Sequence, residues 1–413
     1  MAYEMRMQSF LWKECGKMEI ENRKTKKYAV WLLWAGIAVY GGLCLYLFYM
    51  QSIQPLDYDN RYFQSDLPYH ISMIIDDGWY YSFTAYIYQL LYALAGGGTA
   101  LIAVFLAAVT VLAIALTERL LRMLLGRRGQ DALTLGGAFA LNLVMPFFWT
   151  YAGQYRYVSY QSGNIWHNST YQCMKLLALA AVIVYGRVEA GYRERVTAGQ
   201  WAALAALLFV CTGVKPSFLT VFAPVLAVKL LLDLLWKKVP FKQVFLLGST
   251  VLPACGVILW QNMVLFGADT GHGIDFSPWY TFSLHANKTK LAVLCSIAFP
   301  LAVLLFSFRE LWRDKDYLFV WGMTAVGFLE ALCLVETGSR SRDGNFLWGY
   351  CFAIFLVFAV SFEKWLQFWK KRGQGLFYKV AFGVSGCVFA YQVFCGAYFF
   401  ARLLRGETYF MVG

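Results

Sequence analysis

Residues 99–117 have the sequence TALIAVFLAAVTVLAIALT, in which no side chain is charged and the only polar ones are threonines. Folded as an α-helix, a segment of this length spans about 28 Å. The hydrocarbon layer of a bilayer is roughly 30 Å thick, and isolated core helices seldom reach that length in apolar residues. The segment therefore predicts a helix that crosses a membrane.

Apolar blocks of similar length recur along the chain. Of its 413 residues, 60% are hydrophobic and 15% are charged, which leaves too little polar surface for one soluble domain. We expect residues 1–413 to form a single all-α, polytopic membrane domain, because no long polar linker divides them. We predict about eleven transmembrane helices, at residues 28–50, 99–117, 132–152, 171–186, 200–214, 217–235, 243–266, 290–308, 317–335, 346–362 and 377–400.

The basic residues predict which loops face the cytoplasm, because Lys and Arg concentrate in cytoplasmic loops. With residues 1–27 inside and 51–98 as a long outer loop, 24 of the 36 Lys and Arg residues face inward and 9 face outward. The net charge of +12 thus follows topology and forms no stripe that would bind nucleic acid. We expect an integral, multi-pass plasma-membrane protein with a cytoplasmic N-terminus.

Residues 79–95 form a further apolar block, which we assign to the outer membrane interface. Counting this block as a crossing would place the basic cluster at 119–128 outside and invert every later loop. Its aromatic side chains, among them Trp79, Tyr80 and Tyr81, are amphipathic and prefer the headgroup level. We therefore expect an interfacial helix here, within the first outer loop.

The same loop contains the stretch Ser65-Asp66-Leu67-Pro68, which is typical of a helix start with Ser65 as N-cap and Pro68 in the first turn. Asp66 and His70 would then share one face of a short amphipathic helix. A helix N-terminus favours a charged carboxylate, which makes Asp66 a candidate general base. The structural alternative is that Asp66 only caps the helix.

Two further outer features carry candidate site residues. Asp57 and Asp59 form a D-x-D triplet, a secondary candidate for metal or phosphate-linked chemistry, and a divalent cation is therefore the candidate cofactor. The second outer loop, residues 153–170, combines aromatic rings with hydrogen-bonding groups and includes Trp166 and His167. Such a loop suits a sugar or another amphipathic ligand. The alternative is an interfacial aromatic belt.

Cationic side chains are also expected near the outer face. Lys215 lies where residues 213–217 interrupt two apolar stretches, and Arg340 and Arg342 belong to the fifth outer segment. Lys175 and Glu330 fall about one turn inside the outer ends of their predicted spans, at the depth of Lys215. We therefore expect Lys175, Lys215 and Glu330 to border one outward-facing cavity.

This layout resembles the GT-C superfamily of membrane glycosyltransferases, which use polyprenyl-phosphate-linked sugars. The resemblance lies in Ser65-Asp66-Leu67-Pro68-Tyr69-His70 within a long first outer loop, followed by interfacial helices before the second span. It implies that Asp66 is the catalytic base and that Asp57 and Asp59 are weaker candidates. The adjacent acidic pair usual in that superfamily is missing, because Leu67 follows Asp66.

The resemblance implies a glycosyltransferase that moves a sugar, with inversion, from a polyprenyl-phosphate donor to a glycan, lipid or protein acceptor outside the cytoplasm. Cations would steady the phosphate. The candidates for substrate or phosphate contacts are Lys215, Arg340, Arg342, Lys175, His70, His167 and Trp166. The alternatives are a polysaccharide polymerase or ligase, a transporter or flippase of lipid-linked glycans, and a non-enzymatic scaffold or receptor.

Overall fold

The computed structural model describes residues 2–56, 62–127, 129–265 and 273–413, and within these ranges the chain is mainly helical. Two three-residue strands, β1 Ile274–Phe276 and β2 Leu334–Glu336, pair antiparallel, with Asp275 opposite Val335. The helices are α1 Ala2–Ser52, α2 Leu67–Ile75, α3 Phe83–Leu94, α4 Ala100–Leu124, α5 Ala132–Leu141, α6 Ser169–Gly191, α7 Ala198–Val214, α8 Ser217–Leu235, α9 Phe241–Ser249, α10 Leu252–Leu265, α11 Tyr280–Ser283, α12 Thr289–Ser296, α13 Ala298–Leu311, α14 Lys315–Cys333, α15 Leu347–Lys371 and α16 Leu376–Leu403, with the 3-10 turns η1 Gly338–Arg342 and η2 Arg372–Gln374.

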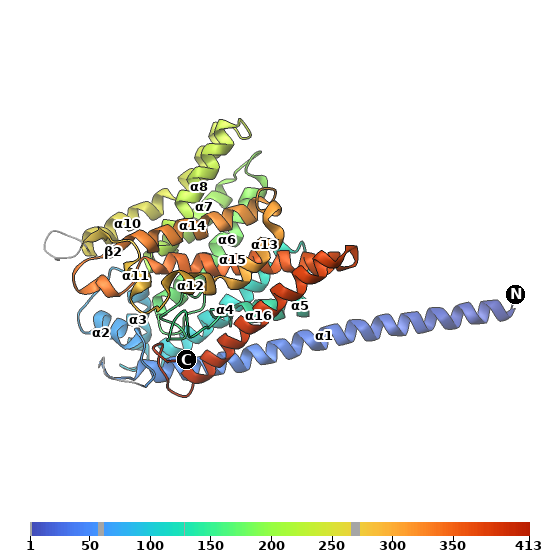
Figure 1. Cartoon of the computed structure of the whole chain (residues 1–413), viewed down its shortest axis with the longest axis horizontal. Helices are drawn as coiled ribbons and strands as arrows, with labels where there is room; N and C mark the ends of the chain where they lie inside the picture. The colour runs from blue at the N-terminus through green and yellow to red at the C-terminus, as the bar shows by residue number, and fades with distance from the viewer. Residues whose placement is uncertain (1, 57–61, 128, 266–272) are drawn as a thin grey trace.

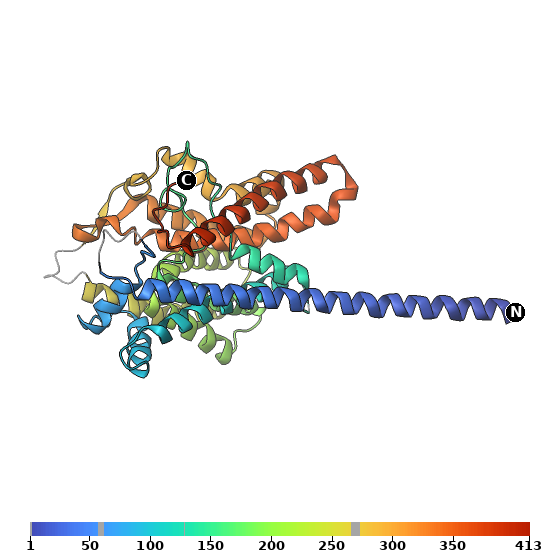
Figure 2. The same ribbon diagram turned by 90° about the horizontal axis from the view of Figure 1, so that it is seen from below.

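The two ends of the bundle differ in what they carry (Figure 1). The short helices α2, α3 and α11, strand β2 and the C-terminus lie together at one end, on the left of the view. The N-terminus lies far to the right, because α1 continues well beyond the other helices, as Figure 2 also shows. We call the left end the α2 end and the right end the opposite end.

Seven of the described helices are long and apolar enough to cross a membrane, or eight if the bent pair α12 and α13 counts as one span. The protein is therefore an all-α, multi-pass integral membrane protein, but the prediction of eleven spans is wrong. The candidate spans are Lys27–Ser52, Ala100–Leu124, Ser217–Leu235, Phe241–Leu265, Lys315–Cys333, Arg340–Gln374 and Leu376–Leu403.

Three predicted spans fail for different reasons, and a fourth, 290–308, is the pair α12 and α13, which is bent by 74°. The block at 132–152 forms a helix only as far as Leu141, and no helix follows before Ser169. Helix α7 has 17 residues and ends before the Lys215-Pro216 break. Helix α6 is long but begins with polar turns that include Gln172 and Lys175, and it is not among the candidate spans.

The apolar block at residues 79–95 is too short as a helix to cross the membrane, as expected. Residues 79–95 contain α3, whose 12 residues cover about 18 Å as an α-helix. That length falls short of the roughly 30 Å hydrocarbon layer. Ser82 caps α3 by accepting a hydrogen bond from the Thr84 amide, which fixes where the helix begins.

Helix α15 forms the centre of the bundle and packs against α14, α8, α13 and α16. Glycines allow the close approach at its first turns. A Cβ on Gly349 would come within 2.5 Å of the Ser217 carbonyl oxygen, and one on Gly327 within 2.8 Å of the Tyr350 Cα. The Gly349 contact holds the start of α15 against the start of α8 and so places Trp348 beside the α7–α8 break, while the Gly327 contact holds α14 against α15.

Residues 142–168 run through the bundle without a helix, and most of their second half is buried. Irregular backbone at membrane depth needs internal hydrogen-bond partners. The Asn164 amide group donates to the carbonyls of Leu141 and Val144, and the Gln392 side chain bridges Met145 and Phe299. These side chains satisfy the backbone that a helix would otherwise satisfy, and the segment reaches the α2 end in a fixed course.

Candidate functional site

Asp66 lies directly before α2, and its carboxylate is turned away from the helix. The N-cap residue is Asp66, not Ser65 as predicted, and its side chain makes no capping hydrogen bond. Instead, Asn168 Nδ2 donates to Asp66 Oδ2 at 2.6 Å, while the Asp66 amide donates to the His167 carbonyl at 3.0 Å. The segment that leads into α6 therefore holds this aspartate through both its backbone and its side chain.

His70 lies one turn further along α2 and faces the same loop. Its Nδ1 is 3.0 Å from the Ser169 hydroxyl, at the first residue of α6. Burial lowers the pKa of His70 to about 4, although the charge of Asp66 opposes this shift. The imidazole is therefore neutral near pH 7 and offers a hydrogen-bonding group without charge.

His167 is 7% exposed and is surrounded by rings. It stacks on Tyr409 with a centroid distance of 4.2 Å, and Tyr157 meets it edge-on at 4.8 Å. Trp348 lies 6.3 Å away. Burial lowers the pKa of His167, with Asp66 again opposing the shift, so this histidine also stays neutral near pH 7.

Lys215 projects from the break between α7 and α8 toward the same place. Its Nζ donates to the Thr170 hydroxyl at 3.2 Å and lies 4.9 Å from the centre of the Trp348 ring. Burial lowers the pKa of Lys215 to about 8, while Asp66 opposes this shift. We call the group Asp66, His70, His167, Lys215 and Trp348 the Asp66 cluster.

A second hydrogen-bonded group adjoins this cluster through Trp348. The indole Nε1 donates to Asn345 Oδ1 at 3.1 Å, and Asn345 Nδ2 donates to Glu336 Oε2 at 2.7 Å. The same carboxylate forms an ion pair with Arg340 at 2.9 Å. Arg340 is close enough for its charge to lower the pKa of Lys215 further. The β1–β2 pair and the η1 turn therefore position a guanidinium next to the cluster.

The structure separates some residues that were expected together. Lys175 is 4% exposed and donates to Asn164 and to the Gly163 carbonyl, with its ammonium 3.8 Å from the centre of the Phe355 ring. Glu330 accepts a hydrogen bond from Thr220. No interaction among the described residues joins Lys175, Glu330 and Lys215, so each of them has its own surroundings.

Two other candidate residues lie outside the Asp66 cluster. Trp166 is 3% exposed, donates to the Tyr40 hydroxyl and packs on Phe399 and Phe400, which makes it a core residue. Arg342 lies near His285. Burial lowers the pKa of His285, and the charge of Arg342 lowers it further.

The acidic D-x-D candidates, Asp57 and Asp59, fall outside the described residues. Within the described ranges, no group of three or more His, Cys, Asp or Glu side chains is arranged to hold a metal ion.

Asn168 belongs to the loop that the sequence predicts to suit a sugar, but it was not among the predicted site residues, and neither were Thr170, Trp348 and Asn345. Asn168 is noticeable in the sequence because Asn is a preferred N-cap, and its Oδ1 does accept from the Tyr171 amide at the start of α6. Asn168 is 4% exposed, and its side-chain nitrogen Nδ2 donates to the Asp66 carboxylate. Thr170 lies at the start of α6 and meets Lys215 because α6 packs against α7. Trp348 and Asn345 have no local signal, since the packing of α15 beside α8 brings them near Lys215.

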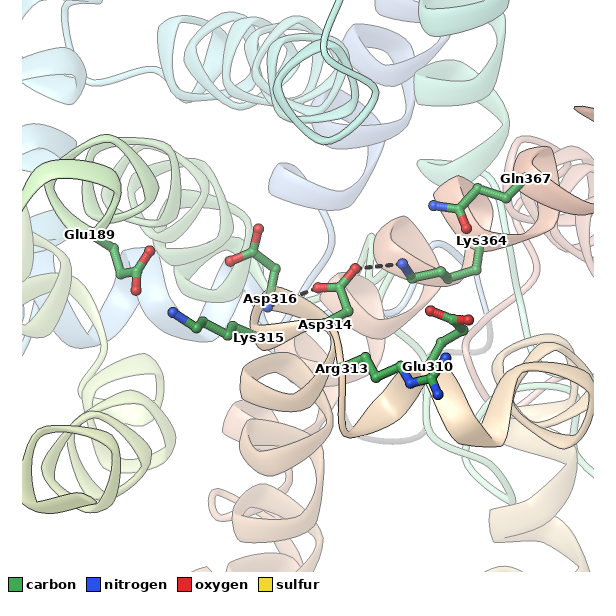
Figure 3. Close-up of a pocket in the computed structure, with 8 residues that line it drawn as sticks. All are labelled: Glu189, Glu310, Arg313, Asp314, Lys315, Asp316, Lys364 and Gln367. Atoms are coloured by element: carbon green, nitrogen blue, oxygen red, sulfur yellow. Dashed lines mark hydrogen bonds and ion pairs between the residues drawn. The ribbon is translucent and has the colours of Figure 1, made fainter. Parts of the chain in front are cut away.

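A hollow lies at the opposite end of the bundle (Figure 3). Its lining includes Glu189 from the end of α6, Asp314 and Asp316 at the start of α14, and Lys364 late in α15. Lys364 pairs with Asp314, and a dashed line marks this contact in Figure 3. Charged groups of both signs line this hollow, and they connect the ends of α14 and α15.

Comparisons of the chain with protein-family models, with curated proteins and with solved structures give no match. The function therefore has to be inferred from the chemistry of the site.

Proposed function

We propose that the Asp66 cluster is the catalytic site of a membrane glycosyltransferase that uses a polyprenyl-phosphate-linked sugar outside the cytoplasm. The observation that carries this proposal is that a carboxylate and an ammonium group lie close enough for the charge of Asp66 to act on Lys215, yet form no ion pair. None of the ion pairs among the described residues includes Asp66 or Lys215. Both groups are thus free to act on a substrate that lies between them.

The positions suit an inverting transfer. Asp66 would accept the proton of the acceptor hydroxyl while that oxygen attacks the anomeric carbon. The bond from the anomeric carbon to the phosphate oxygen then breaks, and polyprenyl phosphate leaves with the electron pair. Lys215, and Arg340 behind it, would stabilise the negative charge on the leaving phosphate. Asn168 would hold the Asp66 carboxylate in one orientation during the attack.

Membrane location supports the same assignment. The cluster is built at the α2 end, where the amphipathic helix α2 and the short helix α3 precede the second long span, Ala100–Leu124. A lipid-linked donor would bring its phosphate to this level of the bilayer while its chain stays among the helices. The charge distribution of the sequence favours an extracytoplasmic position for this end.

The packing between the two ends favours a transferase over a transporter. Phe218 stacks on Phe222 at 5.2 Å, and Phe222 contacts Phe319 at 5.8 Å. Phe352 adds an edge-on contact to Phe218 at 5.3 Å. These rings are on the path from the Asp66 cluster to the hollow at the opposite end, where a transporter would need polar groups near the midplane.

Replacing Asp66 by Asn tests the proposal. The change keeps the size of the side chain and the hydrogen bond from Asn168, so the protein should still fold. It removes the negative charge that lets the carboxylate act as a base. Release of polyprenyl phosphate from a panel of polyprenyl-phosphate hexoses, with membranes as the acceptor source, should fall about 100-fold or more. Asp76→Asn is the matched control, since Asp76 is exposed at the end of α2. Transfer at the wild-type rate by both variants would remove Asp66 from catalysis.

A further inference from the structure

Residues 404–413, which follow α16 and which we call the tail segment, contact both loops that build the Asp66 cluster. The Phe63 amide, three residues before Asp66, donates to the Gly406 carbonyl at 2.8 Å. At the other loop, Tyr155 forms a β-bridge with Val412, and the Gly413 amide donates to the Gln154 carbonyl at 3.0 Å. The tail segment therefore links two loops that are far apart in the sequence.

The turn that starts the tail segment has a defined geometry. Gly406 has φ +92°, a conformation that favours glycine, and a Cβ there would meet the Phe63 ring at 3.1 Å. Arg402, in the last turn of α16, pairs with Glu407 and donates to the Val412 carbonyl at 3.3 Å. These contacts fix the direction in which the segment leaves the helix.

The turn places Tyr409 on His167. The two rings stack at 4.2 Å with an interplanar angle of 19°, which makes Tyr409 the ring most nearly parallel to this imidazole among its described neighbours. Phe410, the next residue, points elsewhere and contacts Tyr155 and His285 edge-on, at 6.2 and 5.6 Å. Two adjacent aromatic residues thus serve two different histidines.

His167, on which Tyr409 stacks, is hydrogen-bonded to Asp66 through its backbone. The His167 carbonyl accepts the Asp66 amide hydrogen bond, and the neighbouring Asn168 donates to the Asp66 carboxylate. A shift of the His167 peptide would therefore move both partners of Asp66 at once. Displacements of about 1 Å at a reacting group are enough to cost about 100-fold in rate.

We propose that Tyr409 is a positioning residue, which fixes the Asp66 carboxylate through His167 and Asn168. The stacked ring carries this role, and phenylalanine keeps that ring whereas leucine does not. The catalytic consequence rests on the proposed function, whereas the contact between Tyr409 and His167 does not depend on it. The two can therefore be tested separately.

The first experiment measures histidine accessibility in the full chain, purified in detergent. Diethylpyrocarbonate modifies neutral imidazoles, and peptide mass spectrometry follows each histidine. In Tyr409→Leu, modification of His167 should accelerate about tenfold relative to wild type, because a side chain that is 7% exposed loses its stacked cover. Tyr409→Phe should keep the wild-type rate.

Phe410→Leu is the matched control for this measurement. It should accelerate the modification of His285, which Phe410 contacts, and leave His167 at its wild-type rate. Equal His167 rates in wild type and Tyr409→Leu, or the same His167 acceleration in both leucine variants, would overturn the assignment of Tyr409.

The second experiment measures sugar transfer by the same variants. Tyr409→Leu should lower kcat by about tenfold to 100-fold with KM near the wild-type value, since Lys215 still binds the donor. Tyr409→Phe should restore kcat. An exposed His167 with unchanged kcat would overturn the coupling to Asp66. Absence of transfer by the wild-type chain would refute the proposed function, and the histidine pattern would still decide whether Tyr409 holds His167.

Discussion

The ammonium group of Lys215 should make donor binding depend on pH in a window where few other groups of the Asp66 cluster titrate. Burial places the pKa of Lys215 at about 8, whereas the pKa of His70 is about 4 and that of His167 is also lowered. Both histidines are therefore neutral above pH 7. Polyprenyl phosphate itself is close to fully charged there, since its second pKa is about 6.

The size of the effect follows from the pKa. With a value of about 8, roughly nine tenths of the Lys215 side chains are charged at pH 7 and roughly one tenth at pH 9. If only the charged form binds the phosphate, the affinity for polyprenyl phosphate should fall about tenfold between these two pH values. Lys215→Arg keeps a permanent charge and should bind with little change over the same range. Lys215→Met should bind weakly at both.

Stability changes in the opposite direction, which separates weaker binding from unfolding. A lysine whose pKa is lowered in the folded state binds fewer protons there than in the unfolded state. The contribution of Lys215 to the free energy of unfolding should therefore rise as the pH goes from about 8, the pKa in the folded state, to 10.5, the ordinary pKa of lysine.

The assay is equilibrium binding of radiolabelled polyprenyl phosphate to the detergent-purified chain at pH 7, 8 and 9, with thermal unfolding measured in parallel. A constant affinity from pH 7 to 9 in the wild type would refute the role of Lys215. The same loss of affinity in Lys215→Arg would refute it as well, because arginine stays charged.

Two further predictions concern groups around the cluster. Lys175→Met should lower the free energy of unfolding by about 1–3 kcal/mol, because Asn164 and a buried carbonyl lose their donor. Thermal unfolding measures this change. The control is Lys290→Met, at an exposed lysine. Asn345→Ala should raise the dissociation constant of polyprenyl phosphate about fivefold, the equivalent of one weakened cation–π contact, because Trp348 loses its link to Glu336. Unchanged values in either variant would contradict the assigned contact.

Hydrophobic block length alone predicted the membrane class and the positions of most long helices. It failed where polar residues inside an apolar block change the local structure. The block at 132–152 contains Asn142 and Pro146, and its helix ends at Leu141. The hydropathy of this block does not reveal that the Asn164 side chain, 20 or more residues later, will donate to the carbonyls of Leu141 and Val144.

Local chemistry also singled out Asp66, His70, His167 and Lys215, which the structure brings close to one another. Depth along a predicted span was a poorer guide. Lys175 and Lys215 were expected at the same level, yet the first is enclosed by Asn164 and Phe355 and the second faces Thr170 and Trp348. The direction in which a side chain points depends on helix rotation, which neighbouring helices determine.

The sequence by itself determined that the chain is helical and lies in a membrane, since both follow from the length and composition of contiguous segments. It also determined which loop carries a carboxylate before a short amphipathic helix. Only the tertiary structure decided that Asn168 and His167 hold Asp66 and that Tyr409 covers His167. These contacts join residues about 100 to about 240 positions apart, and no local pattern encodes them, because they form only when separate segments of the chain pack against one another.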